Sequence, residues 1–147
     1  MKIAVSACLL GYNCKYDGGN NYNQRVYNLM DKHIICPICP EVYGGLTTPR
    51  SPSEIQMSDK EILNLLNKEG KDVTENFVLG ANKALELCKL KDIKVAILKS
   101  KSPSCGCGII YDGSFTGKLI SGDGVTAKLF KENGIKIYNE NDEWKLE

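Results

Sequence analysis

The sequence contains a single histidine, His33, and no surplus of charge of either sign. One histidine cannot supply a multi-histidine metal site, and it makes a histidine-based catalytic triad implausible. Nineteen lysines and arginines face eighteen aspartates and glutamates, which leaves a formal net charge of +1 with the two signs interspersed. Because a basic surface is what attracts nucleic acids and anionic membranes, we expect neither a long nucleic acid nor a membrane among the partners.

The sequence also lacks an apolar run long enough to span a membrane, and its cysteines do not pair off. Residues 5–8, VSAC, look like a lipoprotein cleavage box, but the four residues before them are too few for the apolar stretch of about 7–15 residues in a signal peptide. Seven cysteines are an odd number, which fits a closed disulfide framework poorly. We therefore expect reduced thiols and a cytoplasmic location.

The apolar residues predict an alternation of strands and helices. With 147 residues, 42% of them hydrophobic, the chain can bury one core, and we expect a single domain over residues 1–147. Short apolar or β-branched runs, typical of central parallel strands, occupy residues 2–7, 33–37, 94–99 and 135–139. The expected fold class is α/β, a three-layer, Rossmann-like arrangement around a mainly parallel central sheet of about four strands.

Two helical patterns lie between the second and third of these runs. Ser58 and Glu61 form a capping box, which predicts a helix over the apolar residues that follow, Ile62, Leu63, Leu65 and Leu66. A longer helix is predicted from Thr74, and its apolar face consists of Phe77, Ala81, Ala84, Leu85 and Cys88.

Three further elements complete the expected fold. Residues 124–134 predict a helix that stops at a glycine, and a weaker helical pattern lies within residues 21–32. A small β-hairpin insertion is expected over residues 108–120, around Asp112 and Gly113, because Asp-Gly favours tight turns.

Six of the seven cysteines lie at or after the ends of the first three predicted strands. Cys8 directly follows the first strand, Cys39 lies two residues past the second, and Cys105 lies six residues past the third. Because ligands of open α/β sheets bind beyond the carboxyl ends of the strands, we expect these three thiols to meet at one edge. Cys88 lies on the apolar face of a helix and is expected to be core. Cys14 is either an incidental loop thiol or a support for the site.

The clustered thiols fit three chemistries unequally. A redox pair of Cys36 and Cys39 would need to open a helix, and Pro40 with the glycines after it disfavours one. A zinc site needs four ligands such as Cys36, Cys39, Cys105 and Cys107, but the one-residue gap in the second pair is tighter than usual. An iron–sulfur site fits best, because thiolates, Cys-Pro steps and exposed backbone N–H groups recur around such clusters.

Six blocks of the sequence resemble, in order and over nearly the whole chain, the DUF523 family. The blocks are VSACLLGYNCKYDGG, CPEVYGGLTTPRSPSEI, DVTENFVLGA, AILKSKSPSCG, YDGSFTGKLISGDGVTA and GIKIYNE. Some members of that family are described as thiouracil desulfidases, iron–sulfur enzymes that remove sulfur from a thiolated uracil. The resemblance implies a [4Fe-4S] cluster held by cysteines that match Cys8, Cys39 and Cys105, with the remaining iron taking the sulfur of a small thiolated base. Cys36 departs from the family pattern, so Cys36 and Cys39 both stay open as ligands, and zinc stays the alternative cofactor.

Polar residues near these cysteines are candidates for the chemistry. Glu41 is the best placed carboxyl for a proton donor, since an acid must lie within hydrogen-bond reach of the reacting atom. Ser102 is the second catalytic candidate, because its hydroxyl can bond the substrate ring. Ser104, Gly106 and Asp17 are expected to contact or position the cofactor.

The expected reaction is attack of water on a thiocarbonyl carbon while a Lewis-acidic iron holds the sulfur. Lys99, Lys101 and Arg50 can hold an anion or the uracil carbonyl, although solvation at the surface is the commoner fate of such side chains. The alternative function is a non-catalytic zinc- or iron–sulfur-binding protein that senses metal or redox state.

Overall fold

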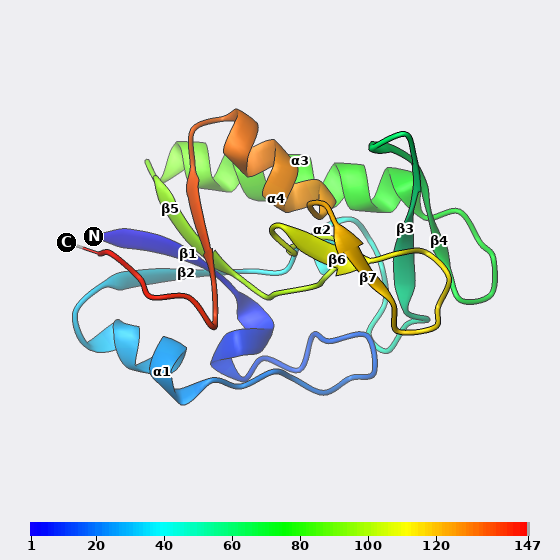
Figure 1. The fold of residues 1–147 in the computed structure, drawn as a ribbon. Coiled ribbons are helices and arrows are strands. Elements are labelled where there is room, and N and C mark those ends of the chain that lie inside the picture. The colour runs from blue at the N-terminus through cyan, green and yellow to red at the C-terminus, as the bar shows by residue number, and fades with distance from the viewer. Residues whose placement is uncertain (147) are drawn as a thin grey trace.

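A parallel four-stranded sheet forms the centre of the computed structural model, which describes residues 1–146. Its strand order is β2-β1-β5-β8, with bounds Ile34–Ile38, Lys2–Ser6, Val95–Leu98 and Lys136–Asn139. Each strand lies on one of the four predicted runs. The α/β class and the parallel sheet are therefore confirmed (Figure 1).

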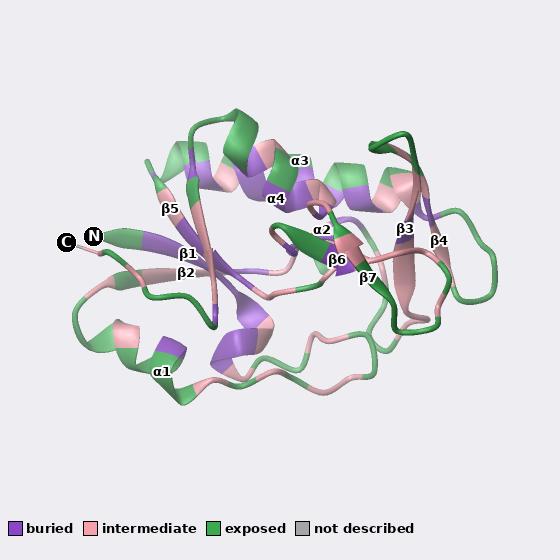
Figure 2. Cartoon of the chain, in the orientation of Figure 1, coloured by how far each residue is buried: buried purple, intermediate pink, exposed green. Residues whose placement is uncertain are grey.

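Alternation of side chains along β1 builds a core on each face of the sheet. Ala4 faces the layer of α3 (Thr74–Leu90) and α4 (Val125–Glu132), whereas Ile3 and Val5 face the opposite layer. That second layer holds η1 (Ala7–Leu10), α1 (Gln24–Tyr27) and η2 (Asn28–Asp31). The last two lie within residues 21–32, where the weak helix is predicted. Figure 1 shows the helices on both sides of the sheet, and Figure 2 shows that their buried faces turn toward it.

The long helix α3 follows its sequence pattern. Phe77, Ala81, Ala84, Leu85 and Cys88 are all buried, as the helical spacing predicts. The shorter helix α4 ends before Gly134, whose φ of 78° lies in the left-handed region that favours glycine. No helix within residues 1–146 is both long enough and apolar enough to cross a membrane.

The predicted helix after Ser58 is wrong, because this segment forms an antiparallel hairpin of β3 (Ser53–Ser58) and β4 (Glu61–Asn67). Ser58 and Glu61 face each other across the turn instead of capping a helix. Leu65 is fully buried in a core cluster that includes Phe77 of α3, whereas Leu63, two residues before it, is 67% exposed. Packing of β3 and β4 against Phe77 of α3 and against Ile110 therefore overrides the local helical pattern.

The expected second hairpin is present. It pairs β6 (Ile109–Tyr111) with β7 (Leu119–Ser121), and residues 112–118 connect them, so Asp112 and Gly113 begin a longer loop rather than forming a two-residue turn. Glu54 on β3 accepts hydrogen bonds from the Gly113 and Phe115 N–H groups at 2.9 and 3.2 Å. The two hairpins are thereby joined beside the end of the central sheet.

Candidate functional site

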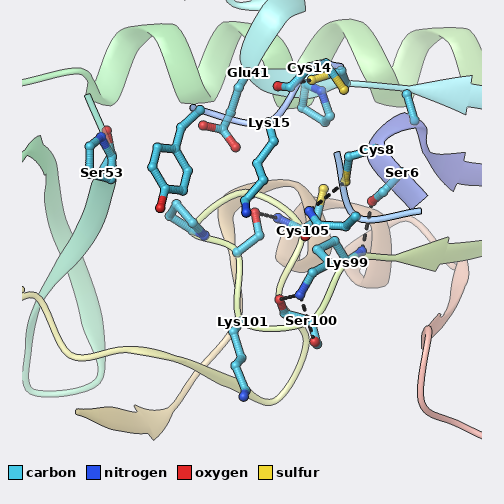
Figure 3. Close-up of a pocket in the computed structure, with 18 of the residues that line it drawn as sticks. Ser6, Cys8, Cys14, Lys15, Glu41, Ser53, Lys99, Ser100, Lys101 and Cys105 are labelled. Carbon is cyan, nitrogen blue, oxygen red and sulfur yellow. Dashed lines mark hydrogen bonds between the residues drawn. The ribbon is translucent and has the colours of Figure 1, made fainter. Parts of the chain in front are cut away.

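A cavity of about 470 Å³ lies beyond the carboxyl ends of β1, β2 and β5 (Figure 3). Its wall includes four thiols, from Cys8, Cys14, Cys39 and Cys105, together with Glu41, Lys99, Ser100 and Ser102. Cys8 lies in η1 directly after β1, Cys39 directly precedes α2, and Cys105 lies in the loop after β5. The strand ends thus bring together the three thiols that the sequence placed at this edge, while their role as ligands stays a prediction.

The segment after Cys39 corrects the sequence analysis, because a one-turn helix, α2 (Pro40–Tyr43), begins there despite the proline. Proline is suited to the first helical position, where its missing N–H is not needed and its φ is already helical. Cys39, rather than Cys36, occupies the N-cap of this helix. A redox pair with Cys36 at the helix start is therefore absent from residues 1–146.

Two glycines set the position of α2 against α3. A Cβ added at Gly80 would lie 1.8 Å from the Pro40 carbonyl oxygen, and one added at Gly44 would lie 1.9 Å from the Asn76 carbonyl oxygen. The Asn76 side chain also donates to the Gly44 carbonyl at 2.9 Å. The backbones of α2 and α3 are consequently in direct contact, and this contact fixes Cys39 and Glu41 relative to the core.

Cys8 and Cys105 are thiols whose ionised forms are disfavoured by burial but favoured by one polar neighbour each. Burial raises the pKa of Cys8, and the Asn21 amide, which donates to its sulfur at 3.4 Å, opposes that rise. Burial raises the pKa of Cys105 to about 12, and the Ser6 hydroxyl opposes that rise. Figure 3 shows Cys8 and Cys105 side by side. A bound metal ion would supply the positive charge that makes both thiolates stable.

Among the thiols that line the cavity, Cys39 is the one whose pKa is lowered. Its pKa is lowered chiefly by a hydrogen bond with the Cys14 thiol and also by the Val42 N–H in the first turn of α2. The same contact with Cys39 raises the pKa of Cys14, and Cys14 lines the cavity beside Cys39. Cys14 is therefore a neighbour of the site and not an incidental loop thiol.

Glu41 enters the cavity from α2, opposite Cys8 and Cys105 in Figure 3. Arg50 holds the carboxylate through its Nε at 3.3 Å, and the same guanidinium donates to the Cys14 carbonyl at 2.7 Å. Burial raises the pKa of Glu41, and Arg50 only partly offsets this. The side chain of Arg50 is 7% exposed, so this cation is a fixed part of the wall and not a solvated surface residue.

Ser102 lines the cavity, and its hydroxyl proton is not used in a hydrogen bond to the described residues. Its hydroxyl oxygen accepts the N–H groups of Ser104 and Cys105 at 3.1 and 3.0 Å. With both interactions made at oxygen, the O–H remains available to donate into the cavity. The Ser100 hydroxyl differs, because it donates to Glu140 at 2.9 Å.

Ser104 and Gly106 shape the loop after β5 and do not line the cavity, while their expected contact with a cofactor stays a prediction. The buried Ser104 hydroxyl bonds the Thr126 hydroxyl of α4 at 2.8 Å. The Gly106 N–H donates to the Ser102 carbonyl at 2.8 Å, and a Cβ at this position would lie 2.6 Å from that oxygen. Both residues therefore stabilise the loop conformation that places Ser102 and Cys105 in the cavity wall.

Asp17 also lies outside the cavity lining, and its expected role beside the cofactor stays a prediction. Its carboxylate accepts the Gly19 N–H at 2.9 Å and faces Lys15 at 3.6 Å, with the side chain 50% exposed. This is the turn chemistry that Asp-Gly sequences favour. The structure thus gives Asp17 a role in folding the loop after Cys14.

The four cysteines of the zinc alternative do not converge. Cys36 and Cys107 pack against the core between the sheet and α3 and do not line the cavity that contains Cys39 and Cys105. Within residues 1–146, no group of three or more Cys, His, Asp or Glu side chains is close enough to hold a single metal ion. An iron–sulfur cluster has a wider requirement, because each of its thiolates binds a different iron.

Several polar residues at the site were not predicted from the sequence. Ser6 is the last residue of β1, and its hydroxyl accepts the backbone N–H of Lys99 at 2.9 Å. A serine at the end of an apolar run was a detectable clue to a buried polar function. Glu140, which bonds Ser100 and Lys99, is distant in sequence and carried no clue. Lys101 belongs to the cavity lining, and its side chain points away from Cys8 and Cys105 in Figure 3.

Known proteins resemble this chain over nearly its whole length. A family model described as 2-thiouracil desulfurase matches residues 3–142. The uncharacterized protein YbbK of Bacillus subtilis (strain 168) is 41% identical over 145 residues, which cover 95% of this chain and 96% of YbbK. Among solved structures, the [4Fe-4S]-dependent thiouracil desulfidase TudS (DUF523Vcz) superposes with a TM-score of 0.84 at 40% identity, covering 95% of this chain and 91% of TudS. The chain therefore belongs to the 2-thiouracil desulfurase family.

Proposed function

We propose that the protein is a [4Fe-4S]-dependent desulfidase that converts thiouracil and water to uracil and hydrogen sulfide. The observation that carries this proposal is one cavity whose lining includes three cysteines that each follow a different strand of the central sheet, in a chain 40% identical to TudS. The reaction exchanges a C=S bond for a C=O bond, so it needs no electron donor or acceptor. The reduced thiols that such a site requires agree with the expected cytoplasmic location.

The donor set of the cavity fits an iron–sulfur cluster. Cys8, Cys39 and Cys105 would hold it, and the side chains of Asn21 and Ser6 and the Val42 N–H stand beside the three sulfurs. Hydrogen bonds to sulfur are a usual feature of the protein shell around such clusters. When bound through three cysteines, the cluster would supply an iron without a protein ligand, as a Lewis acid for the substrate sulfur.

Glu41 carries the proton in this proposal. Water must lose a proton to attack the thiocarbonyl carbon, and the departing sulfur must gain one. Glu41 faces the same space as Cys8 and Cys105, and Arg50 keeps its carboxyl in a fixed orientation. Its elevated pKa lets the carboxyl exchange a proton near neutral pH more readily than a solvated glutamate does.

Ser102 orients the substrate ring. Its free O–H can donate to a ring carbonyl or nitrogen, whereas the Ser100 proton is already committed to Glu140. Both serines line the cavity. Their different bonding supports a role in substrate binding for Ser102 and a structural role for Ser100.

The test is metal content together with turnover after anaerobic purification. We expect a brown protein with about four irons and four sulfides per chain, which releases sulfide from 2-thiouracil or 4-thiouracil. A colourless protein with one zinc would contradict the proposal. A brown protein without turnover of either base would favour the metal- or redox-sensing alternative.

A further inference from the structure

A buried carboxylate stands behind the cavity wall without lining the cavity. Glu140 directly follows β8, and its side chain is 10% exposed. One carboxylate oxygen accepts the Ser100 N–H at 2.8 Å, and the other accepts the Ser100 hydroxyl at 2.9 Å and pairs with the Lys99 ammonium at 3.2 Å. A buried charge is tolerated only when it is paired and hydrogen-bonded. Here every partner of that charge is a residue of the cavity wall.

Glu140 is itself held in place from the opposite layer of the fold. Arg25 of α1 donates to the Glu140 carbonyl at 3.0 Å and to the Asp142 carbonyl at 2.6 Å. The same guanidinium lies 3.7 Å from the centre of the Trp144 ring. The segment after β8 is therefore held against α1, and this fixes the backbone from which the Glu140 side chain extends.

The loop from Lys99 to Gly106 is anchored on both sides of Ser102. Before Ser102, Glu140 holds Ser100, and Lys101 forms a β-bridge with Ile110. After Ser102, at the second anchor, the N–H groups of Val125 and Thr126 at the start of α4 donate to the carbonyls of Pro103 and Ser104, both at 2.9 Å. Cys105 directly follows this second anchor.

The stretch between the anchors contains a strained residue. Lys101 has a φ of 66°, in the left-handed region that lysine rarely adopts. Such a conformation persists only where the surrounding structure imposes it. A β-bridge between Lys101 and Ile110 also restrains this residue. Removal of the anchor at Ser100 would leave Lys101 restrained on one side only, and this would let the neighbouring Ser102 shift.

We propose that Glu140 is a positioning residue for desulfuration, which acts through Ser100 and Lys99 to hold Ser102 at its place in the cavity wall. This inference depends on the proposed function. Glu140 touches neither the substrate nor the cluster, so its loss should lower kcat without releasing iron.

The test compares Glu140→Ala with Asp123→Ala in the iron-loaded protein. Asp123 is a matched control, because it also accepts a backbone N–H, from Gly108 at 2.7 Å, and pairs with a lysine, Lys131 at 3.1 Å, but it does not line the cavity and has no bond to Ser100 or Ser102. We expect kcat per bound cluster to fall about 10–10²-fold in Glu140→Ala, the cost of a small misplacement at a reacting centre. KM and iron content should change no more than in Asp123→Ala, which should keep the wild-type kcat.

Two conservative variants separate positioning from general stability. Glu140→Gln keeps an acceptor for the Ser100 N–H and should recover most of kcat, whereas Glu140→Asp keeps the charge but is too short and should give an intermediate value. If Glu140→Ala does not fold, these two variants decide, and equal wild-type kcat in both would overturn the inference. Iron loss in Glu140→Ala with Asp123→Ala fully loaded would overturn it as well. Turnover by the wild type is measured first, because its absence would contradict the proposed function, whereas wild-type activity in Glu140→Ala would contradict this inference alone.

Discussion

Cys88 and Cys105 are the two most deeply buried cysteines of the described residues, at 0% and 6% exposure, yet their surroundings differ. Burial raises the pKa of both thiols, to about 11 for Cys88 and about 12 for Cys105. Cys88 lies near the C-terminal end of α3, on its buried side among apolar side chains. Cys105 lies at the sheet end, in a wall shared with other thiols and beside Ser6. Burial alone therefore does not assign a role to a cysteine, whereas its place relative to the strand ends and its polar neighbours do.

The sharpest way to break this comparison is to remove each thiol. Cys105→Ala should abolish both iron retention and turnover, and so should Cys8→Ala and Cys39→Ala, because each leaves an iron without its ligand. Cys88→Ala should keep both and lower the free energy of unfolding by about 1 kcal/mol, the loss of a small apolar group from a core. Iron content, the visible spectrum and thermal unfolding measure these effects. Bleaching by Cys36→Ala instead of Cys39→Ala would show that the ligand assignment is wrong.

The next largest effect should come from a substitution of Glu41, which lines the same cavity as Cys105 but is not expected to bind the cluster. Glu41→Gln keeps the shape of the side chain, so iron content and colour should not change. Turnover of thiouracil should fall about 10²–10⁴-fold, the usual contribution of a positioned acid or base. Loss of the cluster in Glu41→Gln would make the residue structural or a ligand, and full activity would mean that the proton comes from water or from Ser102.

The smallest expected effect distinguishes the two serines around Cys105. Ser102→Ala should lower kcat about 10–10²-fold at unchanged iron content, because the substrate loses a donor and the loop loses an acceptor. Ser104→Ala should leave kcat unchanged and cost about 1 kcal/mol of stability, since it only deprives the buried Thr126 hydroxyl of its partner. The steady-state rates and unfolding curves of the two variants decide the matter, and a larger kcat loss in Ser104→Ala would reverse the assignment.

The central sheet and α3 were predictable because their patterns are local. Apolar runs gave the four parallel strands, and the helical spacing from Phe77 to Cys88 gave the buried face of α3. The convergence of Cys8 and Cys105 followed from a general property of parallel sheets, in which strand ends of the same sense share an edge.

The errors arose where distant contacts decide the structure. Leu65 belongs to a strand because β3 and Phe77 complete a core around it, and no pattern within residues 58–67 contains that information. The bond between Glu140 and Ser100 joins residues 40 positions apart, so sequence alone did not show it. Ser104 and Gly106 stand next to Cys105 in sequence, but the hydrogen bonds of the loop turn them away from the cavity.

The backbone contact between α2 and α3 makes the site vulnerable to a change that alters no reactive group. A methyl group at position 80 would overlap the Pro40 carbonyl, and relief would require α2 to tilt or α3 to slide. Either movement would carry Cys39 and Glu41 away from Cys8 and Cys105. Substitutions on the exposed side of α3 should therefore be tolerated, whereas any residue larger than glycine at position 80 should displace the site.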